Sequence, residues 1–263
     1  MIGADWRIDV VRFFRRGARY LLSRYFRLIT GNQQRFILIL AHMRSGSTLL
    51  AHILMSHPEV LGLGERNAPY RSQADVERLI VDSYWHYRRW RQPIPYVVDQ
   101  LNHNRFLSPE LLAHPHGRFI FLIREPEASL ASMVDVLGHF YGFSLDDALT
   151  YYPHRLHQLA QYAQTLNDPQ RGFYLSYTDL TQRTEHLLPA LQHFLQMKHP
   201  LTPDYHQFSF TGQHGDPSPR IRTGNIQPPT SRPLPDLPVA VHRHLQEVYH
   251  ATENTLRDKC THL

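Results

Sequence analysis

A short polar loop near residue 44 contains the residue types that bind a phosphate group. It follows the apolar run 36–41 and comprises Arg44, Ser45, Gly46, Ser47 and Thr48, before Leu49 opens a segment with helical spacing. In a strand–loop–helix unit of this kind, backbone N–H groups and the N-terminal end of the helix converge on an anion. Gly46 lets the backbone approach the ligand closely. We therefore predict that residues 44–49 bind a phosphate group.

The loop differs from the one that binds nucleoside triphosphates. That loop has the pattern G-x-x-x-x-G-K-[ST], in which the lysine contacts the β- and γ-phosphates. Here Ala41 stands at the first glycine and Ser47 at the lysine, and Arg44 is the only arginine or lysine in the loop. The sequence thus predicts a phosphate site without the triphosphate lysine. A plain strand-to-helix turn with an incidental arginine is the alternative.

Three polar residues elsewhere in the chain have side chains that can bind an anion or accept a proton. Glu65 follows Gly64, Arg124 ends the apolar run 119–123, and Ser132 stands eight residues later in the expected next helix. Open α/β sheets bind ligands at the carboxyl ends of their strands, where Arg124 is expected to lie. A glutamate has a pKa of about 4.3 and can accept a proton at neutral pH. Each residue also has a purely structural alternative. Arg124 would be an arginine at the sheet edge, Ser132 a helix serine, and Glu65 a loop carboxylate paired with Arg66.

The loop resembles the 5′-phosphosulfate loop of sulfotransferases that use 3′-phosphoadenosine 5′-phosphosulfate (PAPS). Its form, R-S-G-[ST]-T, is most similar to tyrosylprotein sulfotransferases and to bacterial carbohydrate and small-molecule sulfotransferases. The resemblance continues without a gap to Gly64 and Glu65 and resumes over residues 119–132. A weaker match covers residues 174–180, which resemble the family's Y-E-D-L segment. Together these matches span roughly residues 35–180.

This resemblance implies a donor site and an activity. It implies transfer of a sulfuryl group from PAPS to an acceptor hydroxyl, with 3′-phosphoadenosine 5′-phosphate (PAP) as the product. Arg44 would contact the 5′-phosphate and the bridging oxygen, and the rest of the loop would supply N–H groups and hydroxyls. Arg124 and Ser132 would bind the 3′-phosphate. Tyr177, in the weakest of the matches, joins the expected donor-binding residues.

The resemblance also implies a general base, for which the chain offers two candidates. Glu65 stands where tyrosylprotein sulfotransferases carry their catalytic glutamate. Cytosolic sulfotransferases use a histidine near the second strand, and His103 is close to that position, so it is the second candidate. A solvated or structural histidine is the alternative. Many members carry a lysine at the end of the second strand. This chain has Gln100 at that position, and a glutamine can hydrogen-bond a sulfonyl group but adds no charge.

Alternating strand and helix patterns predict an α/β fold. We expect a P-loop-like three-layer sandwich with a mostly parallel central sheet and helices on both faces. Strands are expected at residues 35–42, 96–100, 118–123 and 173–177. Helices are expected at residues 47–56, 72–91, 127–137, 156–166, 187–195 and 241–256. Residues 199–238 hold nine of the 19 prolines and are expected to form a long loop over the cofactor or substrate, with Arg220 and Arg222 closing on the 3′-phosphate or remaining in solvent.

Composition limits the class of protein. A chain of 263 residues with a net charge of +5 is expected to form one main domain, residues 31–263, that binds a polyanionic cofactor. The single Cys260 excludes an intrachain disulfide framework, which favours a cytoplasmic setting. No run approaches the roughly 20 apolar residues that span a bilayer. Residues 1–30 are expected to contain a basic amphipathic helix, over 4–29, that packs on the domain or contacts a membrane surface.

Other functions remain open at this stage. Scattered histidines and the absence of H-E-x-x-H predict no metal site. A P-loop nucleotide kinase or NTPase is one rival, although it would need a loop lysine. A non-catalytic nucleotide-binding or membrane-docking protein is the other. The acceptor is expected to be a small molecule, a carbohydrate or a lipid, and nucleic acid is not an expected partner.

Overall fold

A computed structural model describes residues 34–263 except residues 90, 105, 214, 215, 231, 233 and 235, together with residues 17, 18, 21, 22, 24, 25 and 28. The helix expected over residues 4–29 therefore lies largely outside the described residues and stays a prediction. Among the described residues, no helix is both long and apolar enough to cross a membrane.

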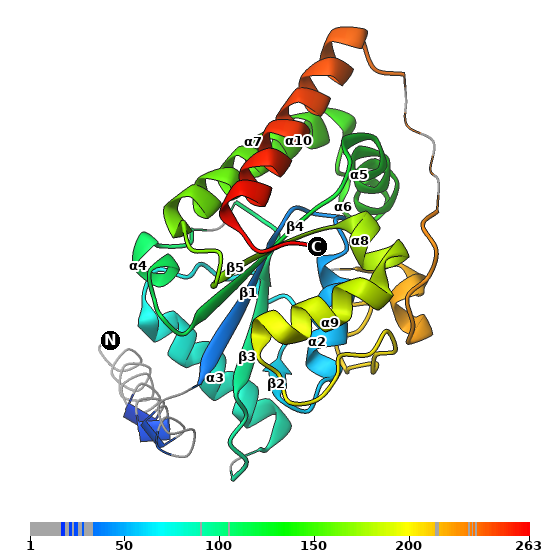
Figure 1. The fold of residues 1–263 in the computed structure, drawn as a ribbon. Coiled ribbons are helices and arrows are strands. Elements are labelled where there is room, and N and C mark those ends of the chain that lie inside the picture. Colours follow the sequence, from blue (N-terminus) through cyan, green and yellow to red (C-terminus); the bar gives the residue numbers. More distant parts are fainter. Residues whose placement is uncertain are drawn as a thin grey trace, which may run out of the picture.

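Five parallel strands form the central sheet in the order β2-β3-β1-β4-β5 (Figure 1). They are β1 (Arg35–Ala41), β2 (Val60–Gly62), β3 (Tyr96–Leu101), β4 (Gly117–Ile123) and β5 (Gly172–Ser176). β1 lies in the centre and pairs with β3 and β4, with Leu40 opposite Leu101 and Phe121. Because all strands run in parallel, their carboxyl ends meet at one edge. Four strands were predicted from the sequence, and β2, only three residues long, was not.

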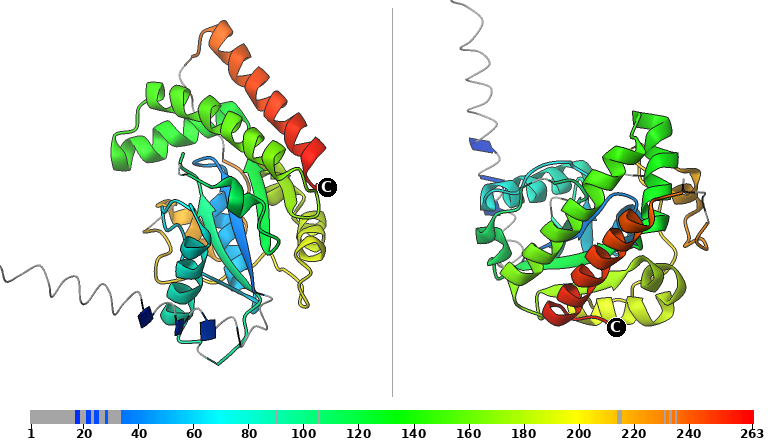
Figure 2. Two further views of the ribbon diagram at one scale, coloured as in Figure 1. Left: turned by 90° about the vertical axis from the view of Figure 1, so that its left-hand side faces the viewer. Right: turned by 90° about the horizontal axis from the view of Figure 1, so that it is seen from above.

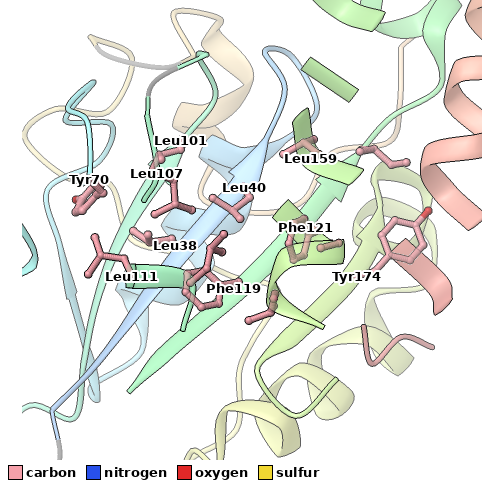
Figure 3. Packing of buried hydrophobic residues seen from close by; sticks show 14 of the residues in the cluster. Leu38, Leu40, Tyr70, Leu101, Leu107, Leu111, Phe119, Phe121, Leu159 and Tyr174 are labelled. Atoms are coloured by element: carbon pink, nitrogen blue, oxygen red, sulfur yellow. The ribbon is translucent and has the colours of Figure 1, made fainter. Parts of the chain in front are cut away.

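Apolar side chains cover both faces of this sheet, as expected for strands with near-continuous hydrophobic runs. Alternate residues of β1 point to opposite sides, so Leu38 and Leu40 enter one core and Ile37 and Ile39 enter the other. Figure 3 shows the first of these cores around Leu38, Leu40, Phe119 and Phe121. The predicted three-layer α/β architecture is confirmed.

Helices form the outer two layers. One face carries α3 (Gln73–Tyr87), α4 (Pro109–Leu112), α5 (Pro126–Ser132), α7 (Leu145–Leu166) and α10 (Val239–Lys259). The other carries α2 (Ser47–Ser56), α8 (Tyr177–Gln182) and α9 (Thr184–Leu195). α7 and α10 lie side by side (Figures 1 and 2). A capping box at Ser72 marks the start of α3, which ends at residue 87 rather than at the predicted 91.

The helix predicted over residues 127–137 is interrupted by a π-helical turn. α5 is followed directly by η1 (Met133–Leu137) and then by α6 (Gly138–Tyr141). Such single turns are rare and occur often at functional sites. The turn changes which residues share a face, since a π-helix bonds residue i to i+5 instead of i+4.

The proline-rich segment 199–238 runs along the edge of the molecule between α9 and α10 (Figure 1). Its described residues contain one regular element, the short 3-10 helix η2 (Pro219–Thr223). Tyr205, Phe210 and Ile221 anchor the segment because their side chains are buried in the core on the α2 side of the sheet. The loop is therefore attached to the domain and passes over the carboxyl edge.

Candidate active site

A cavity of about 590 Å³ opens at the carboxyl edge of the sheet. It brings together residues from the β1–α2 loop, the segments after β2 and β3, the α5–α6 region and the proline-rich segment. The predicted site residues that line it are Arg44, Gly46, Ser47, Thr48, Leu49, Glu65, His103, Arg124, Ser132, Tyr177 and Arg220. Residues far apart in the chain thus share one space, as with Arg44 and Asp216, which are 172 positions apart.

The β1–α2 loop turns sharply at two residues with positive φ. Arg44 has φ 65° and Gly46, the N-cap of α2, has φ 97°. A Cβ atom at Gly46 would lie 2.9 Å from Cδ2 of Tyr177, so this position has no room for a side chain. The N-terminus of α2 therefore faces the cavity with the free N–H groups and positive dipole that favour an anion.

Arg44 connects two parts of the site. Its Nε donates to Oγ of Ser132 at 3.0 Å, and its Nη1 donates to Oδ1 of Asp216 at 2.9 Å. Burial alone would raise the pKa of Asp216, but the Arg44 charge and a hydrogen bond from the Ser218 N–H outweigh it and the pKa is lowered. The arginine of the loop is thus paired with a carboxylate that sequence reasoning did not identify.

Arg124 lies at the end of β4 with its side chain buried beside the loop. Its Nη1 donates to the carbonyl of Arg44 at 3.2 Å, and its guanidinium carbon lies 4.1 Å from the centre of the Tyr177 ring. Its Nε has no hydrogen-bond partner among the described residues. A buried guanidinium N–H of this kind is available to an anion in the cavity, since unpaired buried donors are costly.

Arg232 is a site residue that sequence reasoning missed. It comes from the proline-rich segment, and its Nη1 donates to Oγ of Ser132 at 3.3 Å while its Nε pairs with Asp135 at 2.6 Å. Nothing in the local sequence distinguishes it from Arg220 and Arg222. Arg220 also lines the cavity, but its guanidinium bonds to Thr230 and to backbone carbonyls of its own segment.

Glu65 and His103, the two candidate bases, are in direct contact. Nε2 of His103 lies 3.0 Å from Oε1 of Glu65, and Nδ2 of Asn102 donates to Oε2 at 3.2 Å. Glu65 is nearly buried, with 9% of its side chain exposed, whereas His103 is 38% exposed. The carboxylate is thus held from two sides at the wall of the cavity.

Three polar residues, of which His42 and Arg155 are fully buried, hold this edge together. His42 accepts from the Arg124 N–H through Nε2 at 3.0 Å and donates from Nδ1 to the Met43 carbonyl at 2.8 Å. Burial lowers the pKa of His42 to about 3, so it stays neutral. Tyr151 donates to the Asn102 carbonyl and accepts from the Met43 N–H. Arg155, fully buried on α7, donates to carbonyls at the ends of β1 and β3.

Three residues singled out from the sequence lie outside the cavity lining. Ser45 is fully buried and donates from Oγ to the His42 carbonyl, so its side chain stabilises the turn. Arg222 is exposed and packs against Gly212. Gln100 is buried below the site, where its Oε1 lies 3.5 Å from Nδ2 of Asn102. Among the described residues, no group of His, Cys, Asp and Glu is placed to hold a metal ion.

Fold and site together define an α/β protein with a sharply turned loop and a helix N-terminus after its first strand, at the edge of a cavity. The sequence model of the "Sulfotransferase family" matches residues 72–200, just under half of the chain, and supports its assignment to a sulfotransferase family. The matched region includes Arg124, Ser132 and Tyr177 but not the loop at Arg44 or Glu65. No curated protein sequence matches the chain significantly.

Two solved structures share the fold. The sulfotransferase domain from the curacin biosynthetic pathway has a TM-score of 0.57 at 17% identity, covering 82% of this chain and 98% of that one. The sulfotransferase domain of the Synechococcus PCC 7002 olefin synthase has a TM-score of 0.54 at 17% identity, covering 82% and 94%. These likenesses extend over most of both chains and concern the fold.

Proposed function

We propose that this protein transfers a sulfuryl group from PAPS to an acceptor hydroxyl. One observation carries the proposal: Arg44, Glu65, Arg124 and Ser132, from separate segments, line one cavity at the carboxyl edge of the sheet. The match to the sulfotransferase family model supports the reaction class. The identity of the donor rests on the anion-binding features of the loop and of Arg124.

The residues present fit a donor with two phosphate groups. The loop from Arg44 to Leu49 and the N-terminus of α2 would hold the 5′-phosphate, at a turn that Gly46 allows because glycine tolerates its positive φ. Arg124 has an unpartnered Nε, and Ser132 contacts the guanidinium groups of Arg44 and Arg232. These residues would hold the 3′-phosphate. Guanidinium groups suit this task because one group can form two parallel hydrogen bonds to the oxygens of a phosphate.

Arg44 and Glu65 would perform the two tasks that the reaction requires. Sulfuryl transfer is an in-line displacement with charge spread over the moving group, much as in phosphoryl transfer. The acceptor oxygen bonds to sulfur as the bond from sulfur to the phosphate oxygen breaks. Arg44 stabilises the charge on the leaving oxygen, and Glu65 takes the acceptor's proton. Before this, Arg44 must exchange Asp216 for the donor phosphate.

Calorimetry with PAP and with adenosine 5′-phosphate tests the donor assignment. PAP should bind the more tightly of the two, and Arg124→Ala should remove most of the difference. A hydrogen bond to a charged group is worth about 1.5–3 kcal/mol, or roughly 10- to 150-fold in affinity. Arg118→Ala is the matched control, because Arg118 lies near the opposite end of the same strand. Equal affinities for the two nucleotides, or tighter binding of ATP than of PAP, would contradict the assignment.

A further inference from the structure

The cavity has two chemically different ends. At one end the cationic side chains of Arg44, Arg124 and Arg232 gather around Ser132 and Asp216. At the other end a second network joins Glu65, His103, Asn102, Tyr151 and Met43. The two networks meet at the loop, where Met43 and Arg44 are neighbours and where His42 bonds to both the Arg124 N–H and the Met43 carbonyl. This second end is where an acceptor would lie if the first holds the donor.

An apolar wall lines the second end. Met43, Phe143 and Tyr151 pack against the hydrophobic core that includes Leu137, and all four line the cavity. Phe143 lies beside Leu137, because its N–H donates to the Leu137 carbonyl at 3.4 Å. Tyr141 also lines the cavity and is 69% exposed, so it stands at the opening. The hydroxyl of an acceptor would thus contact polar groups, while the rest of the molecule would contact apolar side chains.

The π-helical turn explains how one helix serves both ends. Ser132 contacts Arg44 and Arg232 at the cationic end, and Leu137 belongs to the apolar wall. The two residues are five positions apart, which in an α-helix would separate them by about 140° around the axis. Bonding from i to i+5 through η1 brings residues five apart onto nearly the same face. The local irregularity therefore directs a polar and an apolar side chain into the same cavity.

The acceptor end carries little positive charge. Among the described residues that line it, the titratable groups are Glu65, His103, Tyr141 and Tyr151, and burial raises the pKa of Tyr151 to about 12. The imidazole of His103 already contacts Glu65. An anionic acceptor would meet the Glu65 carboxylate without an arginine or lysine from these residues to offset the repulsion.

We propose that the acceptor is an uncharged alcohol with an apolar body, bound along Met43, Leu137, Phe143 and Tyr151 with its hydroxyl at the Glu65–His103 pair. The proposal rests on the proposed function for its reaction. The acceptor oxygen forms a bond to sulfur, the sulfur–oxygen bond to the donor phosphate breaks, and the acceptor proton moves to Glu65. The products are a sulfate ester with an apolar tail and PAP.

Binding of simple alcohols tests this without requiring turnover. Butanol, hexanol and octanol would be titrated against N-phenylnaphthylamine, an uncharged fluorescent probe of apolar sites, and the probe's displacement measured. Affinity should rise roughly two- to fourfold for each added methylene group, as for burial of a CH₂. Two compounds should displace the probe poorly. One is glucose, and the other is the hydroxy acid that has a carboxylate at the end of hexanol opposite its hydroxyl. A parallel assay with PAPS would detect sulfate esters.

Substitutions at the wall locate the site. Phe143→Ala should weaken octanol binding roughly tenfold and flatten the dependence on chain length, because part of the apolar wall is lost. Phe140→Ala is the matched control, since Phe140 is 54% exposed on α6 and does not line the cavity. Tyr141→Ala, at an exposed position, should weaken octanol binding even if Phe143→Ala fails to fold. PAP affinity should not change in any folded variant.

Two outcomes would overturn the inference. One is an affinity that does not depend on chain length, or that is higher for glucose or the hydroxy acid than for hexanol. The other is octanol binding that Phe143→Ala and Tyr141→Ala leave unchanged while PAP binding is normal. If alcohols bind as expected but no sulfate ester forms from PAPS, the apolar acceptor site stands and the proposed function fails. The two proposals are thus separable.

Discussion

The contact between Glu65 and His103 changes how the general base must be tested. From the sequence they are alternatives, taken from two branches of the family, but Nε2 and Oε1 lie 3.0 Å apart. Glu65 is the more buried of the two, and its Oε2 accepts a hydrogen bond from Asn102. We infer that Glu65 accepts the proton and that His103 helps to orient it.

Glu65→Gln should lower kcat by about 10²–10⁴-fold, the usual loss when a general base is removed. PAP affinity should stay near that of the wild type, since the contacts of Glu65 belong to the acceptor end. His103→Asn should cause a much smaller loss. Steady-state kinetics of both variants with one acceptor decide the point. If Glu65→Gln keeps its activity and His103→Asn loses it, the histidine is the base.

Asp216 forms an ion pair with Arg44, the arginine that the proposed mechanism needs for the donor. Because the carboxylate pairs with Arg44 at 2.9 Å, a donor phosphate must compete with it. Asp216→Asn keeps the size and removes the charge, so PAP should bind roughly tenfold more tightly. Calorimetry measures this, with the exposed Asp204→Asn in the same segment as control. Weaker PAP binding by Asp216→Asn would instead mean that Asp216 holds Arg44 in place.

At the scale of elements, His42 joins the end of β1 to the end of β4. Its Nε2 accepts a hydrogen bond from the Arg124 N–H and its Nδ1 donates one to the Met43 carbonyl, which requires the neutral ring. Its pKa is about 3 in the fold and 6.5 in an unfolded chain. Between these values the unfolded chain binds a proton that the fold does not, so the free energy of unfolding falls as the pH falls.

His42→Gln should therefore reduce the loss of stability between about pH 6.5 and about pH 4. Urea denaturation at several pH values measures the slope. His186→Gln, at an exposed histidine, is the control and should leave the slope unchanged. Asp99 acts in the opposite direction, because burial raises its pKa to about 6 and its protonation favours the fold. Identical slopes for the wild type and His42→Gln would show that His42 does not titrate in this way.

Elements with strong local patterns were predictable, and irregular ones were not. The run 36–41 and the loop at Gly46 mark a strand and a turn whatever their surroundings, and they appear as expected. The π-helical turn at 133–137 has no pattern of its own, and β2 is too short to show one. α7 begins at Leu145 rather than near 156, because Pro153 within it obscured the first turns.

At the scale of the whole molecule, the missed site residues come from long-range contacts. Arg232 and Asp216 reach the site from the proline-rich segment, 100 and 172 positions from Ser132 and Arg44 respectively. No local pattern distinguishes them, and only the path of the segment over the sheet edge brings them in. Arg44, Glu65, Arg124 and Ser132 were identified from their resemblance to the family's motifs. In the structure each of them follows a strand or lies in the next helix, where parallel sheets gather their ligand-binding groups.

Transfer of labelled sulfate from PAPS tests the central claim most directly. The wild-type protein would be incubated with labelled PAPS, a chelator and a mixture of alcohols, phenols and sugars. We predict a labelled sulfate ester and PAP, with turnover unaffected by the chelator. Arg44→Ala should lose far more turnover than PAP affinity, because charge develops on the leaving oxygen only in the transition state. Tight PAP binding without a sulfate ester from any acceptor, and without hydrolysis of PAPS, would contradict the account and leave a nucleotide-binding protein without this activity.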